Sequence, residues 1–88
     1  MTAYEVVLKP SVEKDLRSLP KNVLQRVWAK IEALSTEPIP RRAVKIAGAE
    51  YLYRVRSGDY RIIYSVNHAA KQVIVHYVRH RSEAYRHL

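Results

Sequence analysis

Hydrophobic and polar positions in the first part of the chain follow the spacing of one strand and then a helix. Residues 3–8 are rich in β-branched and aromatic side chains, which predicts an opening strand. Pro10 suits the first turn of a helix, and Val12, Leu16 and Leu19 then recur at i, i+4 and i+7. The next proline ends this short helix, whose single apolar face must pack against another element.

A second, longer helix is expected from about Lys21 to Ser35, because apolar residues form one stripe and charged residues mostly take the opposite side. The stripe consists of Val23, Leu24, Val27, Trp28, Ile31 and Leu34. Residues 36–40 contain two prolines and are expected to form a loop. Residues 43–46 fit a short edge strand.

From residue 50 onward the hydrophobic period changes to the two-residue period of strands. Turn residues at 57–59 and at 67–71 divide the alternating segments. The predicted strands are 51–57, 60–66 and 72–78, and a short helix is expected within 82–88. We therefore expect a single domain, residues 1–88, of the α+β class. It has two layers: an N-terminal strand and a helical hairpin, then a mostly antiparallel β-meander sheet with a short C-terminal helix.

The composition narrows the possible functions by what it lacks. The 88 residues contain no cysteine, which excludes disulfide scaffolds and thiolate zinc sites. They contain only two glycines, too few for a glycine-rich nucleotide loop. His76 and His80 are four apart in a strand, a poor spacing for a shared metal, so neither a metal nor a cofactor is expected. No apolar run suits a membrane span or a signal peptide, so we expect a cytoplasmic protein without a membrane partner.

Positive charge is the strongest compositional feature. Sixteen Lys and Arg residues against eight Asp and Glu residues give a formal net charge of +8 and a pI near 10.1. Arginine, whose planar guanidinium matches the geometry of phosphate, is more frequent than lysine. In so small a domain this charge favours a nucleic-acid partner.

Strand parity collects part of this charge on one face of the sheet. A turn at residues 57–58 would set Arg54 opposite Arg61, and a turn shifted by one residue on each strand keeps the same parity. The core face then contains Tyr53, Val55, Tyr60, Ile62 and Tyr64, and the other face contains Leu52, Arg54, Arg56, Arg61 and Ile63. Like charges across a ladder are destabilising. This face is therefore either a solvated surface with splayed arginines or a binding site for a polyanion.

Three segments together resemble the RelE family of bacterial toxins, within the RelE/ParE superfamily of toxin–antitoxin systems. They are YRVRSGDYRIIY at residues 53–64, VRHRSEAY at residues 78–85, and the leucine and proline positions of the helical hairpin. The resemblance spans nearly the whole chain. It implies a RelE-like fold and a ribosome-dependent mRNA endoribonuclease that cleaves in the ribosomal A site, inhibits translation and is neutralised by a cognate antitoxin.

The resemblance also implies which residues bind and cleave RNA. The matching positions are Arg54, Arg56 and Arg61 on the hairpin and His80, Arg81 and Tyr85 near the end of the chain. The family often has lysine on the first hairpin strand, where this chain has arginine. Arg79 stands where a small or acidic residue is common, so its role stays open.

The available side chains limit how such a cleavage would proceed. Without a metal, the RNA 2′-hydroxyl must be activated and the leaving 5′-oxygen protonated. Arginine stays protonated and therefore cannot accept a proton as a base, so the arginines are expected to bind phosphate and stabilise developing charge. Histidine is the residue type best suited to proton transfer at neutral pH, so His80 is favoured for this role, with Tyr85 as a stacking group or a base.

Two other functions stay open. A ParE-type inhibitor of DNA gyrase shares the superfamily fold without the nuclease residues, although the combination of His80, Arg81 and Tyr85 argues against it. A non-catalytic RNA-binding module would need the basic surface alone. Translating ribosomes with end-mapped mRNA would distinguish all three functions.

The arginine-bearing face is also the expected antitoxin site. If Val66 lies opposite Val73, parity gives this face an aliphatic part made of Leu52, Ile63, Ile74 and Val78. An acidic amphipathic segment would cover these residues and pair with the arginines, unless the toxin's own loops cover them. The free toxin is expected to be monomeric and to form a hetero-oligomer with its antitoxin.

Overall fold

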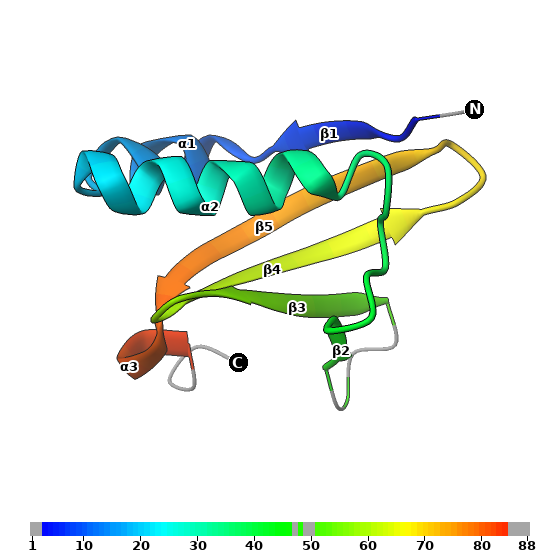
Figure 1. The fold of residues 1–88 in the computed structure, drawn as a ribbon. Coiled ribbons are helices and arrows are strands. Elements are labelled where there is room, and N and C mark those ends of the chain that lie inside the picture. The colour runs from blue at the N-terminus through cyan, green and yellow to red at the C-terminus, as the bar shows by residue number, and fades with distance from the viewer. Residues whose placement is uncertain (1–2, 47, 49–50, 85–88) are drawn as a thin grey trace.

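The computed structural model describes residues 3–46, 48 and 51–84, which form a two-layer α+β fold (Figure 1). The elements are β1 (Glu5–Leu8), α1 (Pro10–Arg17), α2 (Lys21–Ala33), β2 (Val44–Lys45), β3 (Leu52–Ser57), β4 (Tyr60–Asn67), β5 (Gln72–His80) and α3 (Arg81–Ala84). The expected fold class is confirmed. Within these ranges, no helix combines the length and the hydrophobicity that crossing a membrane requires.

In the described part of the chain, five strands form one sheet in the order β1-β5-β4-β3-β2. The strands β3, β4 and β5 are antiparallel neighbours, whereas β1 pairs in parallel with β5. A parallel pair needs a long connection that crosses over the sheet. The segment between β1 and β5 contains both helices and the strands β2, β3 and β4. Figure 1 shows α1 and α2 side by side over one face of the sheet.

The core lies between the helical hairpin and this face of the sheet. Val27, Ile31 and Leu34 recur along α2 and its C-terminal end and are almost fully buried. The strands contribute alternate residues: Val55, Ile62, Tyr64, Val73, Val75 and Val78. Trp28, which the sequence pattern placed in the same apolar stripe, is 41% exposed and lies outside the core.

The turn between β3 and β4 lies at residues 58–59, one residue later than the expected turn at 57–58. Gly58 has a φ angle of 60°, a left-handed conformation that glycine adopts without steric cost in a two-residue turn. Arg56 consequently lies opposite Arg61, and Arg54 lies opposite Ile63. The expected pair of Arg54 with Arg61 is wrong, whereas the parity of both strands is as predicted.

A β-bulge in β5 changes which of its residues face the helices. The pairing of β5 with β4 shifts register between Val75 and Tyr77, so His76 is an extra residue. Beyond the bulge the parity of β5 is inverted: Val78 joins the core, and Tyr77 and Arg79 lie on the opposite face. The expectation that Val78 lies on the arginine-bearing face is therefore wrong.

The bulge also gives stability a dependence on pH. His76 Nε2 lies 2.8 Å from Ser65 Oγ, and partial burial, together with the charge of Lys9, lowers the pKa of His76 below its ordinary 6.5. The unfolded chain then accepts a proton that the folded state resists. We expect the free energy of unfolding to fall as the pH drops below about 6.5, and His76→Gln to reduce this fall. Urea titrations at several pH values measure both, and an identical pH dependence in the variant would contradict the assignment.

Candidate functional site

The face of the sheet turned away from α1 and α2 carries a row of arginines. Arg56 of β3 pairs across the ladder with Arg61 of β4, and Arg61 pairs with Arg79 of β5. Three arginine positions on three adjacent strands therefore lie in one line, which we call the arginine row. Arg54 lies on the same face, two residues before Arg56 on β3.

The row combines high charge with different degrees of burial. Arg61, in the middle, is 9% exposed, whereas Arg56 is exposed and Arg54 is half-buried. Like charges at facing positions of a ladder destabilise a sheet by up to about 1 kcal/mol. The negative charges of a chain of phosphates would offset this repulsion, and each guanidinium can donate two parallel hydrogen bonds to phosphate oxygens.

Arg79 connects the arginine row to the helical layer. Its guanidinium forms an ion pair with Asp15 of α1 and lies 5.2 Å from the centre of the Tyr77 ring. The pairing of β1 with β5 ends at Val75, four residues before Arg79, and the long arginine side chain reaches α1. The position of Arg79 therefore depends on both layers of the fold.

Loss of this ion pair should have a small, salt-dependent effect on stability. Both side chains are partly exposed, so we expect Asp15→Asn to lower the free energy of unfolding by about 1 kcal/mol or less. The loss should shrink at high salt because salt screens charges near the surface. Urea unfolding at two salt concentrations measures it, with Glu13→Gln on the exposed side of α1 as the matched control. Equal effects of the two substitutions would show that the ion pair contributes nothing.

His80 lies at the end of β5, on the other side of the sheet from the arginine row. It pairs with Tyr60, and the two rings meet edge to face with their centres 5.3 Å apart. Tyr60 packs against the core, so the His80 ring is on the helical side. The backbone N–H of Ser82 donates to His80 Nδ1 at 3.3 Å, and Ser82 Oγ lies 3.0 Å from the same nitrogen. In the neutral ring the hydrogen is therefore on Nε2, which can donate to a ligand.

Arg81 lies beside the tip of the β3–β4 hairpin. Its backbone N–H donates to the carbonyl oxygen of Asp59 at 2.7 Å, and its exposed guanidinium is 4.0 Å from the Asp59 carboxylate. Tyr85 lies outside the described residues. The structure thus brings three of the expected residues into one surface with an added fourth: Arg54, Arg56, Arg61 and Arg79.

Arg79 is the residue of this surface whose role the sequence left open. Its only signal in the sequence is its charge, because its side of the sheet depends on the extra residue His76. Strand alternation alone would have placed Arg79 on the core side and His80 with the arginines.

Comparison with known proteins identifies the fold. Residues 6–85 match the family described as ParE toxin of type II toxin–antitoxin system, parDE. The chain belongs to this toxin family. The toxin is 33% identical to RelE1, a toxin of Methanocaldococcus jannaschii, over 94% of this chain and 96% of that relative. The expected membership of the RelE/ParE superfamily is confirmed.

Two solved structures show the same fold in RelE-type toxins. A chain of the archaeal RelE–RelB complex from Pyrococcus horikoshii is 39% identical, with a TM-score of 0.81, covering 96% of the toxin and 100% of that chain. A chain of the toxin–antitoxin complex RelBE2 from Mycobacterium tuberculosis is 27% identical, with a TM-score of 0.79, covering 90% of the toxin and 99% of that chain. The protein is therefore a RelE-type toxin of a toxin–antitoxin system.

Proposed function

We propose that the toxin is a ribosome-dependent endoribonuclease that cleaves mRNA in the ribosomal A site and so inhibits translation in the cytoplasm. The arginine row is the observation that carries this proposal. Together with Arg54 it forms a cationic surface on three adjacent strands, which suits the phosphate chain of a single RNA strand. The ribosome would supply the orientation of the mRNA that so small a protein has little surface to impose.

The proposed reaction uses the nucleophile that RNA itself carries. The 2′-hydroxyl oxygen attacks the adjacent phosphorus while the bond from phosphorus to the 5′-oxygen breaks. One fragment then ends in a 2′,3′-cyclic phosphate, and the other begins with a 5′-hydroxyl. Arg61, flanked by Arg56 and Arg79, would stabilise the extra negative charge on the phosphorus oxygens, commonly the largest contribution to such catalysis.

Proton transfer needs groups other than arginine, whose guanidinium stays protonated and cannot act as a base. We propose His80 as the proton donor, because its Nε2–H can point to a ligand while Ser82 engages Nδ1. The His80 ring is on the helical side of the sheet, so the leaving 5′-oxygen would reach it past the end of β5. Arg81, next to His80 in the chain, would stabilise the negative charge that develops on the leaving 5′-oxygen. Tyr85 remains the proposed stacking group or base.

The chemistry of the mRNA ends tests this function. The toxin is incubated with ribosomes translating a defined mRNA, and the fragments are mapped and their ends identified. We expect breaks in A-site codons with 5′-hydroxyl ends, the products of a metal-independent attack by the 2′-hydroxyl. Ends with 5′-phosphate would contradict this mechanism, and intact mRNA would contradict the nuclease function.

The family description favours a second candidate function, a ParE-type inhibitor of DNA gyrase. Incubation of the same protein with gyrase, DNA and ATP would then yield DNA breaks linked to gyrase. An RNA-binding module without catalysis would bind ribosomes and leave both mRNA and DNA intact.

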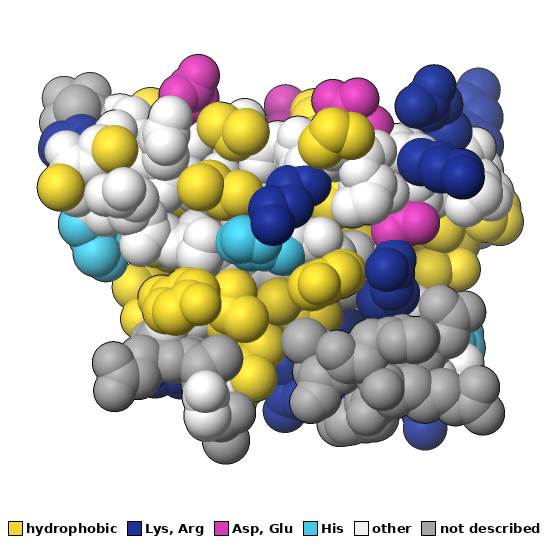
Figure 2. Space-filling model, turned by 180° about the vertical axis from the view of Figure 1, so that it is seen from behind, with side chains coloured by type: hydrophobic (Ala, Val, Ile, Leu, Met, Phe, Trp, Pro, Cys, Tyr) yellow, Lys and Arg dark blue, Asp and Glu magenta, His cyan; other side chains and the backbone are white. Residues whose placement is uncertain are grey.

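We also propose a cognate antitoxin as a partner, because the similar chains from P. horikoshii and M. tuberculosis come from toxin–antitoxin complexes. The arginine-bearing face includes partly exposed apolar residues: Leu52, Ile74 and Tyr77. Ile63, expected in the aliphatic part of this surface, lies on the same face but is fully buried. Seen from behind, hydrophobic side chains form a band below the helices, next to Lys and Arg side chains (Figure 2). An acidic amphipathic segment would cover the apolar residues and pair with the arginines.

Antitoxin binding should slow hydrogen exchange at residues 52–63. Light scattering should show a monomeric free toxin and a hetero-oligomer after the two proteins are mixed. Hydrogen exchange followed by mass spectrometry of the complex locates the protected segments. Protection confined to the outer surfaces of α1 and α2 would contradict the proposed antitoxin site.

A further inference from the structure

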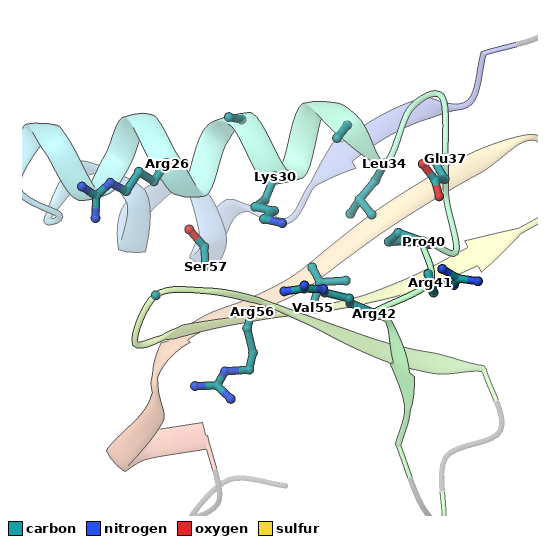
Figure 3. Close-up of a pocket in the computed structure, with 13 residues that line it drawn as sticks. Arg26, Lys30, Leu34, Glu37, Pro40, Arg41, Arg42, Val55, Arg56 and Ser57 are labelled. Carbon is teal, nitrogen blue, oxygen red and sulfur yellow. The ribbon is translucent and has the colours of Figure 1, made fainter.

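A groove between α2 and β3 gathers a second set of cations. Its walls are the C-terminal part of α2, the segment 37–42 and the hairpin end of β3, and it encloses about 1050 Å³ (Figure 3). The basic residues that line it are Arg26, Lys30, Arg41, Arg42 and Arg56. Glu37 is the single carboxylate among the described lining residues. The groove therefore has a strong excess of positive charge.

No described residue neutralises these cations through an ion pair. The ion pairs in the described part of the chain join Arg79 to Asp15 and Arg81 to Asp59, so none involves the groove. Figure 3 shows Lys30 and Arg42 over the groove from its two walls, whereas Arg56 points away from it. A cleft whose walls carry charge of one sign concentrates the electrostatic potential and attracts ions of the opposite sign.

The lining argues against a hydrophobic protein segment as the main ligand. Leu34 and Val55 are 1% and 5% exposed, so these larger side chains offer a ligand almost no surface. The exposed apolar residues of α2 in the groove, Ala29 and Ala33, are small. Protein interfaces obtain most of their affinity from large anchoring side chains in pockets. A phosphate backbone needs cations and access to water, and both are present here.

We propose that this groove binds the phosphate backbone of folded ribosomal RNA. The inference rests on the proposed function and adds a second contact surface to it. Arg56 is among the residues that line the groove, but its side chain points to the other face of β3, where the arginine row lies (Figure 3). The two surfaces are therefore on opposite sides of β3. RNA of the ribosome in the groove would then hold the toxin in place, while the arginine row meets the mRNA. Phosphate contacts of this kind position a protein without reading base sequence.

Two double variants with the same change in net charge test the inference. Lys30→Ala with Arg42→Ala removes the two cations over the groove. Lys14→Ala with Lys21→Ala removes two exposed cations that do not line it. The affinity for purified ribosomes is measured at several salt concentrations, the cleavage of mRNA on translating ribosomes is measured separately, and circular dichroism verifies folding.

We expect the groove variant to bind ribosomes about tenfold more weakly than the control variant. The plot of log affinity against log salt should be flatter by about 0.7–0.9 for each cation removed from a phosphate contact. In the cleavage assay the loss should appear in the KM for ribosomes rather than in kcat, because neither residue belongs to the arginine row.

The other outcomes separate this inference from the proposed function. Equal weakening of the two variants would overturn the inference by showing an effect of net charge alone. Weaker binding to the antitoxin with normal binding to ribosomes would overturn it in favour of a protein-binding groove. Groove-dependent ribosome binding by a wild-type toxin that leaves mRNA intact would support the inference and refute the nuclease. No ribosome binding by the wild type would overturn both.

Discussion

Arg61→Ala should reduce the rate of mRNA cleavage about ten- to hundredfold. Arg61 occupies the middle of the arginine row, with Arg56 and Arg79 at the facing positions on either side. A charge-assisted hydrogen bond to phosphate is worth about 1.5–3 kcal/mol, and here its loss would fall on the transition state, where the phosphate carries additional charge. Single-turnover cleavage on ribosomes saturated with toxin measures this effect directly.

Two further variants define the cause of that loss. Arg61→Lys keeps the charge but not the planar pair of donors, so we expect an activity between those of the wild type and the alanine variant. Lys45→Ala removes an exposed cation of β2 and should leave the rate unchanged. Thermal unfolding shows whether each variant is folded. Full activity of a folded Arg61→Ala variant would mean that the arginine row is a solvated surface without a role in cleavage.

Ile62→Ala should lower the free energy of unfolding by about 2–5 kcal/mol. Ile62 is fully buried in β4, which lies between β3 and β5, and its side chain is part of the core beneath the helices. Domains of this size are stabilised by only about 5–15 kcal/mol in total, so the variant should be substantially unfolded at modest urea concentrations. Urea unfolding followed by circular dichroism measures the change.

Ile39→Ala is the matched control, because the same side chain is 41% exposed there. Its effect should stay within about 0.5 kcal/mol, as for most surface substitutions. If the two variants lost the same stability, the proposed location of the core under α1 and α2 would be wrong.

Local patterns in the sequence determine the elements of this protein. The 3.6-residue spacing of Val12 and Leu16, and of Val27 and Ile31, predicts α1 and α2, because only one helix face can be buried. The two-residue alternation predicts β3, β4 and most of β5. Gly58 marks the turn between the first two of these strands. These signals lie within a few residues of each other and can be read without knowledge of the fold.

The candidate site was predictable where it depends on the parity of one hairpin. Arg54, Arg56 and Arg61 share a face in the sequence analysis and in the structure, because a shift of the turn by one residue on both strands leaves parity unchanged. The roles of His80 and Arg81 in cleavage remain predictions. Their placement at the sheet end depends on β5, whose alternation changes at His76.

Contacts between distant parts of the chain decide the features of the site that strand parity does not predict. The bulge at His76 inverts the second half of β5, placing Val78 in the core and Arg79 in the arginine row. Strand alternation alone does not show which residue of a strand is extra, because this is decided by the register with the neighbouring strand. The ion pair of Arg79 with Asp15 and the groove between α2 and β3 likewise arise only when the two layers pack. The sequence by itself thus determined the two layers and the charge, and tertiary packing decided which of the arginines meet on one surface.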